Sequence, residues 1–191
     1  MKKRKFKKGM PLKLIASLAM LSAISIILGK YMQIPMGNVM RFSFENLPIL
    51  FAGIAFGPIS GLLTGAVADL VGCLLVGYEI NPVITVGAAM CGGVSGLVSL
   101  VFRKSSTASL PIRIISSVTL AHLVASVVIK TVGLAVYYDM PIGILMLWRL
   151  LNYVIVGVLE CTLLIILMKN RGVTKTVGII TSNRPEGRNE D

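Results

Sequence analysis

The chain has 191 residues and a mean hydropathy of +0.84, with 55% hydrophobic and only 14% charged residues. A soluble domain of this length buries too little surface to hide so much apolar area, which excludes an ordinary soluble protein. The formal net charge is +11. The excess Lys and Arg lie beside long apolar stretches, which argues against a nucleic-acid partner and for a lipid bilayer.

Apolar stretches fill the chain between residues 11 and 169. A helix needs roughly 20 apolar residues to cross a hydrocarbon core about 30 Å thick. We predict an all-α integral membrane protein, a six-transmembrane-helix bundle over residues 11–169. A basic segment (1–10) precedes it, and a tail (170–191) follows, whose composition predicts disorder. The predicted spans are residues 11–29, 42–56, 59–76, 82–102, 112–137 and 142–168.

The second predicted span is short, and only Phe56, Gly57 and Pro58 separate it from the third span. Gly followed by Pro favours a tight turn between two helices. A kink at the same place would instead leave five spans and put the chain ends on opposite sides of the membrane.

Basic residues flank the spans at three places, in segments 2–8, 103–113 and 169–175. With six spans, all three segments fall on the same side, which the positive-inside rule makes the cytoplasm. We therefore predict cytoplasmic N- and C-termini in a multi-pass protein of the plasma membrane. The first apolar stretch lacks a small-residue cleavage site, so we interpret it as a retained helix rather than a signal peptide.

Small residues recur at helical spacing in several spans. Helices in lipid need small residues for close approach, so we predict internal packing along Gly53, Gly57, Gly61, Gly65, Ala88, Gly92 and Gly96. Ala19 and Ala23 form a similar pair in the first span. Two interpretations fit that pair, internal packing or a docking face for another membrane protein.

The three cysteines all lie within predicted spans, and we interpret them as small buried residues rather than disulfide partners or metal ligands. His122 is the only histidine, which excludes a histidine-based metal cluster. We predict no bound metal.

Three cations are predicted in the outer half of the bundle, Arg41, Lys130 and Arg149. Charged groups at membrane depth are costly and usually face a cavity or a partner. Each has a purely structural alternative. Arg41 can reach outer headgroups, Lys130 can form a structural ion pair, and Arg149 with Trp148 can anchor the helix at the interface.

Acidic residues supply possible counter-charges. Glu45, Glu79 and Asp139 are predicted at the same outer level as the cations, and Glu45 lies one turn from Arg41. Asp69 and Glu160 are deeper, and we interpret both as structural partners of neighbouring helices.

Aromatic and amide residues gather at this outer level. Trp148 and Tyr78 offer stacking faces, while Asn81, Thr131 and Asn152 can hydrogen-bond the edge of a flat ring. The cations would bind carboxylates. An alternative is that the aromatic residues form the membrane's interfacial belt. We predict an outward-facing pocket for an anionic aromatic solute, formed by Arg41, Tyr78, Asn81, Lys130, Thr131, Trp148, Arg149 and Asn152.

Catalytic motifs are missing from the sequence. It contains no phosphate-binding glycine-lysine loop, no paired carboxylates at catalytic spacing and no Ser/His/Asp set. We therefore predict a binding protein that is not an enzyme, uses no cofactor of its own and depends on a partner for energy.

Several segments resemble one family. Residues 40–49, 52–58 and 61–70 resemble the substrate-binding S-components of energy-coupling factor (ECF) vitamin transporters, with the folate-type branch most similar. Residues 129–134 and 147–152 resemble the last two helices of that branch. Lys130-Thr131 departs from the Asn-Thr pair of the better-known folate binders.

The resemblance implies a six-helix protein that binds a vitamin near the outer face. It also implies a transmembrane coupling protein and two cytoplasmic ATPases as partners, with ATP used by the partner subunits. Ala19 and Ala23 match the family pattern that contacts the coupling protein, and the segment 30–40 matches its mobile lid. Other vitamins stay open as substrates (pantothenate, riboflavin or a thiamin precursor), as does a structural or assembly subunit of a membrane complex.

Overall fold

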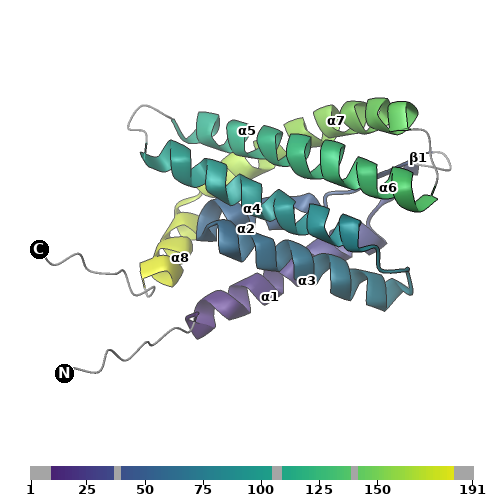
Figure 1. The fold of residues 1–191 in the computed structure, drawn as a ribbon. Coiled ribbons are helices and arrows are strands. Elements are labelled where there is room, and N and C mark those ends of the chain that lie inside the picture. The colour runs from purple at the N-terminus through teal and green to yellow at the C-terminus, as the bar shows by residue number, and fades with distance from the viewer. Residues whose placement is uncertain (1–9, 37–39, 105–108, 139–141, 183–191) are drawn as a thin grey trace, which may run out of the picture.

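The computed structural model describes residues 10–36, 40–104, 109–138 and 142–182. These residues form one elongated bundle of helices with a small β-hairpin at one end (Figure 1). The basic segment and the end of the tail, residues 1–9 and 183–191, lie outside the described residues, as does Asp139.

The elements follow one another along the bundle with short connections. The first helix, α1 (Leu12–Ile26), continues into a π-helical segment, η1 (Ile27–Tyr31). Strands β1 (Ile34–Met36) and β2 (Met40–Phe42) then pair antiparallel, with Pro35 opposite Arg41. The remaining elements are α2 (Asn46–Phe56), α3 (Pro58–Val76), α4 (Pro82–Lys104), α5 (Leu110–Ala121), the π-helical η2 (His122–Ile129), α6 (Lys130–Tyr138), α7 (Ile142–Lys169) and α8 (Arg171–Ser182).

Within the described residues, five helices are long and apolar enough to cross a membrane. They are Leu12–Tyr31, Pro58–Val76, Pro82–Arg103, Leu110–Gly133 and Arg149–Lys169. The membrane-protein prediction is therefore supported, but the second predicted span is shorter than expected. Because the chain folds back as a hairpin before it, α2 has only 11 residues and covers about 16 Å, roughly half the hydrocarbon core.

Gly57 separates α2 from α3, as the sequence predicts. Its φ of 96° lies in a region that glycine adopts without steric cost. Pro58 follows as the first residue of α3, where the missing backbone N–H costs no helical hydrogen bond. The tight-turn interpretation is confirmed, and α2 and α3 are separate helices.

The small residues predicted to pack internally bring α2, α3 and α4 together. A Cβ atom on Gly61 would collide with the Gly92 carbonyl, and one on Gly65 would collide with the carbonyl of Ala88. Gly53 of α2 meets Gly92 in the same way. These contacts confirm the predicted packing, because each depends on two backbones approaching without a side chain between them.

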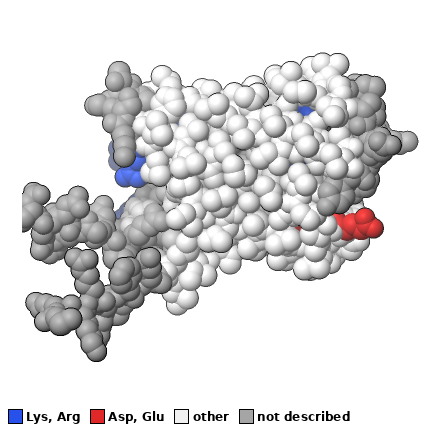
Figure 2. Space-filling view, in the orientation of Figure 1, with Lys and Arg blue, Asp and Glu red and all other residues white. Residues whose placement is uncertain are grey.

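The surface of the bundle is apolar along its length. In Figure 2 the central part of the visible face is largely free of charged side chains. Large hydrophobic side chains such as Leu74, Val101 and Val136 are exposed, which suits lipid contact. Lys and Arg gather at the end of the bundle near the termini, and acidic residues appear at the opposite end (Figure 2).

The tail departs from its predicted disorder between residues 171 and 182, which form α8. Val177 and Ile180, three residues apart, place apolar side chains on one helical face, and that face packs against Leu14 and Leu18 of α1. Because α8 meets the start of α1, both ends of the described chain lie at the same end of the bundle (Figure 1).

Candidate functional site

A polar cavity of about 260 Å³ lies at the hairpin end of the bundle, away from α8. Residues from η1, α2, α3, α6 and α7 meet there, so segments far apart in the sequence form one site. Its lining consists of Gly29, Lys30, Gln33, Ser43, Glu45, Asn46, Asp69, Tyr78, Ile84, Lys130, Arg149, Asn152, Tyr153 and Val156.

Lys130 and Glu45 form an ion pair in this cavity. Lys130 is the first residue of α6 and only 6% exposed, and its Nζ lies 3.6 Å from Glu45 Oε1. A counter-charge at this distance offsets part of the desolvation cost of a buried ammonium group. Glu45 is therefore a neutraliser of an outer cation, as predicted, and the described contact is with Lys130.

Two glycines make room for this pair. A Cβ on Gly29 of η1 would lie 2.7 Å from Glu45 Cβ, and a Cβ on Gly87 of α4 would lie 2.6 Å from Lys130 Cγ. Ser25 of α1 also donates a hydrogen bond of 2.6 Å to the Glu45 carbonyl. The stems of both charged side chains are thus fixed against neighbouring helices.

Arg149 and Lys30 carry charges that no described carboxylate pairs with. Arg149 Nη1 donates to the Ser126 carbonyl of η2 at 3.0 Å. The Lys30 Nζ lies 5.7 Å from the centre of the Tyr78 ring, a cation–π distance. Among the residues that the structure describes, these two are the cavity cations free to meet an anionic ligand.

Asp69 combines a structural bond with a place in the cavity lining. Its Oδ2 accepts a 2.6 Å hydrogen bond from Thr85 Oγ1, which joins α3 to α4. The predicted structural role is therefore confirmed.

The structure brings four of the predicted binding residues to the cavity, namely Tyr78, Lys130, Arg149 and Asn152. Two others lie elsewhere. Asn81 is occupied as the cap of α4, because its Oδ1 accepts hydrogen bonds from the Val83 and Ile84 backbone N–H groups at 3.0 and 3.4 Å. Thr131 is buried but does not line the cavity. The side chains of Arg41, in β2, and Trp148, in α7, lie outside the described residues.

Sequence reasoning missed other lining residues, chiefly Lys30, Gln33, Ser43, Asn46 and Tyr153. Lys30 directly follows the first apolar stretch, where a cation is an ordinary membrane flank, so its position gave no signal of a binding role. Asn46 lies inside a segment used to identify the family and gave no separate chemical signal.

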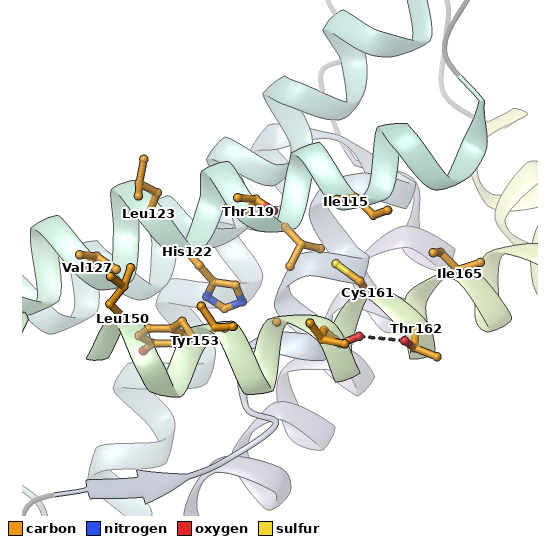
Figure 3. Close-up of a pocket in the computed structure, with 14 residues that line it drawn as sticks. Ile115, Thr119, His122, Leu123, Val127, Leu150, Tyr153, Cys161, Thr162 and Ile165 are labelled. Carbon is orange, nitrogen blue, oxygen red and sulfur yellow. Dashed lines mark hydrogen bonds between the residues drawn. The ribbon is translucent and has the colours of Figure 1, made fainter. Parts of the chain in front are cut away.

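A second cavity, of about 460 Å³ and mostly apolar, lies between α5–η2 and α7 (Figure 3). His122 points into it and stacks on Tyr153, with ring centres 4.7 Å apart. His122 Nε2 lies 2.5 Å from Glu160 Oε2, and Glu160 is fully buried. This confirms Glu160 as a structural partner. Tyr153 lines both cavities, but only the first offers several charged groups to a polar ligand.

Ala19 and Ala23 are both exposed on α1. The pair therefore does not serve packing within the described bundle. It leaves a shallow strip on which another helix could lie closely.

These observations define a class of protein. A bundle with several apolar helices of membrane-spanning length and a cavity carrying both signs of charge at one end is a membrane-embedded solute-binding protein. The family model for the ECF transporter, substrate-specific component, matches residues 13–168. The chain belongs to this family, which confirms the resemblance found in the sequence.

Solved structures share the fold. A crystal structure of FolT bound with folic acid has a TM-score of 0.65 and 22% identity, covering 81% of this chain and 91% of that one. An S-component for biotin has a TM-score of 0.59 and 19% identity, covering 92% of each chain. The S component of a bacterial ECF transporter has a TM-score of 0.55 and 21% identity, covering 82% and 94%.

One sequence relative is an uncharacterized protein, the MG313 homolog of Mycoplasma pneumoniae. It is 34% identical over 98 residues, which is 50% of this chain. The match spans about a third (34%) of that relative's length, so the chain is similar to only part of it.

Proposed function

We propose that this protein captures folate, or a related anionic heterocyclic vitamin, from outside the cell. It then passes the vitamin through the membrane together with a coupling protein and two cytoplasmic ATPases. The observation that carries the proposal is the polar cavity, in which Arg149 and Lys30 have no described carboxylate partner while aromatic rings stand beside them. The fold shared with a folate-bound protein supports the same choice.

The geometry suggests how the ligand is held. A ligand carboxylate binds Arg149 and Lys30, because a guanidinium offers two parallel donors and neither group is already neutralised. Lys130 takes a smaller part than the sequence suggests, since Glu45 competes for its charge. Tyr78 and Tyr153 offer ring faces for stacking.

The small cavity volume leads us to propose that the hairpin moves during binding. At about 260 Å³ the cavity is slightly below the usual range for ligand sites, roughly 300–1,000 Å³. Lys30 and Ser43 line the cavity on either side of the hairpin in sequence. Displacement of β1 and β2 would therefore enlarge the site and let the vitamin enter.

The proposed orientation places the hairpin outside and α8 in the cytoplasm. Arg103 and Lys169 lie in the last turns of α4 and α7 on the α8 side, and Arg171 and Lys175 lie in α8. Basic flanks mark the cytoplasmic side. The strip of Ala19 and Ala23 then faces the coupling protein.

Binding to the purified protein tests the proposal. We expect folic acid to bind, and Arg149→Gln to weaken binding by about tenfold or more, because one charge-assisted hydrogen-bonded contact is lost. Biotin is the control ligand, since a biotin protein shares the fold. Native mass spectrometry of the copurified ligand would identify pantothenate, riboflavin or a thiamin precursor by mass if one of these is bound instead.

If the protein does not bind folate and copurifies with a different vitamin, that vitamin becomes the proposed substrate. A protein that binds no vitamin at all would favour the alternative of a structural or assembly subunit.

A further inference from the structure

One side chain in the cavity lining has a polar atom without a partner. Asn46 is 4% exposed, and its enclosed Oδ1 receives no hydrogen bond from the described residues. Buried amide oxygens are nearly always hydrogen-bonded, because an unpaired one loses its hydration without compensation. An unpaired oxygen at a ligand cavity therefore indicates a donor that arrives with the ligand.

Asn46 differs from the other enclosed atoms that lack partners. Asn81 Nδ2, Thr131 Oγ1, Arg113 Nε and Glu160 Oε1 are also unpaired among the described residues. None of these four residues lines the polar cavity, whereas Asn46 does. The unpaired oxygen and the ligand site thus coincide only at Asn46.

Among the described residues, the Asn46 side chain has no capping role in the local structure. Asparagine often caps a helix, and Asn81 does so at the start of α4. At the start of α2 the cap position belongs to Glu45, and no side chain caps the helix there. Backbone contacts hold this turn instead, since Leu47 N–H donates to the Phe44 carbonyl at 3.1 Å.

The cavity lining contains both acceptors and donors of hydrogen bonds. Asn46 on α2 and Asp69 on α3 contribute an amide oxygen and a carboxylate, which accept hydrogen bonds. Lys130 and Arg149, on α6 and α7, contribute donors. A ligand that matches these groups carries N–H donors for the acceptors and an anionic group for the cations.

We propose that Asn46, together with Asp69, binds the N–H edge of the ligand, an amino-substituted nitrogen heterocycle that also carries a carboxylate. The carboxylate lies toward Arg149 and Lys30. This specificity role rests on the proposed function for the existence of a ligand, but it does not require that the ligand is folate.

The test compares folic acid with an analogue that lacks the ring amino group. Wild-type protein is expected to bind the analogue about tenfold more weakly. Asn46→Leu removes the acceptor at similar volume, so this variant should bind both compounds equally weakly. Asn46→Asp keeps an acceptor and should keep the preference. The matched control is Asn170→Leu, which changes an exposed asparagine outside the cavity and should leave the wild-type ratio unchanged.

A ligand-free measurement separates this role from a structural one. If Asn46 Oδ1 is unpaired until a ligand binds, Asn46→Leu should raise the melting temperature of the ligand-free protein by about 2–4 °C. The reason is that the substitution removes an unpaired buried oxygen. A lower melting temperature, or a wild-type preference retained in Asn46→Leu, would overturn the proposal. If wild-type protein binds no folate, the proposed substrate fails, and the empty-protein melting temperature still decides the role of Asn46.

Discussion

Glycine at two positions decides where the charges of the binding cavity lie. Gly29 and Gly87 each leave the space that a buried charged side chain fills, those of Glu45 and Lys130 respectively. A glycine inside a helix costs about 0.5–1 kcal/mol relative to alanine, so its presence at Gly87 opposes the stability of α4. Glycine at this position is explained by the Lys130–Glu45 ion pair, because the Lys130 side chain fills the space that a larger residue would need.

Gly87→Ala should move Lys130 out of its place and weaken vitamin binding, by less than the loss of about tenfold expected for Arg149→Gln. The added methyl group would lie 2.6 Å from Lys130 Cγ, and that atom is too close to the backbone of α6 to swing freely. Titration calorimetry with the vitamin measures the effect. Gly143→Ala on α7 is the control, because a Cβ there meets nothing within 4 Å. Equal affinities for the two variants would contradict the packing argument.

Residue chemistry made part of the site predictable. Lys130 and Arg149 could be found because a charge deep in an apolar stretch is rare and needs a reason. Lys30 ends an apolar stretch, so its sequence position looks like an ordinary membrane flank. Asn46 carries no charge, and only the fold shows that its oxygen is enclosed without a partner.

At the scale of elements, the path from α5 through η2 to α6 connects the two cavities. η2 holds His122, which pairs with Glu160, and Ser126, which receives the hydrogen bond of Arg149. π-Helical segments often occur at functional sites. Here the segment carries the contacts that tie α7 to the wall of the ligand cavity.

A double-mutant cycle tests the His122–Glu160 pair. His122→Leu should destabilise the protein by about 3 kcal/mol, because it leaves the fully buried Glu160 carboxylate without its partner. The double variant His122→Leu with Glu160→Leu should recover most of that loss, since both polar groups are gone. Denaturation in detergent gives the comparison, and additive losses would show that the two side chains are not coupled.

Elements differ in how well the sequence specified them. The turn at Gly57 was predictable, because glycine and proline there leave the chain few alternatives. The start of α2 was not, since the predicted span begins at Phe42, whereas Phe42 pairs with Ile34 in the hairpin and α2 begins at Asn46. α8 was hidden by its polar composition, and only its spacing of Val177 and Ile180 suits the helical face that packs on α1.

At the scale of the whole molecule, close backbone packing of α2, α3 and α4 forms a compact half of the bundle. The closest backbone contacts between α3 and α4 involve glycine and alanine, whereas α5–η2 and α7 leave an apolar cavity between them. Because the ligand cavity lies where these two halves meet, a vitamin would connect the tightly packed half to the looser one.

The arrangement of the chain ends predicts which end of the bundle faces the outside of the cell. Both described chain ends lie at the same end of the bundle, an arrangement that fits the predicted even number of crossings. With the hairpin end outside, Glu79→Cys should react with a membrane-impermeant maleimide on intact cells, because Glu79 is exposed in the connection between α3 and α4. Lys175→Cys, exposed on α8, should react only after permeabilisation.

Wild-type protein provides the blank for this labelling, since its three cysteines, Cys73, Cys91 and Cys161, are buried or half-buried in helices. The reverse labelling pattern would agree with the fold but with the opposite orientation in the membrane. The vitamin cavity would then face the cytoplasm, and the proposal of capture from outside would be wrong. Labelling of both variants on intact cells would contradict the proposal that the hairpin end and α8 lie on opposite sides of the membrane. The positive-inside assignment favours the first outcome, because the basic flanks at Arg103 and Lys169 lie at the α8 end.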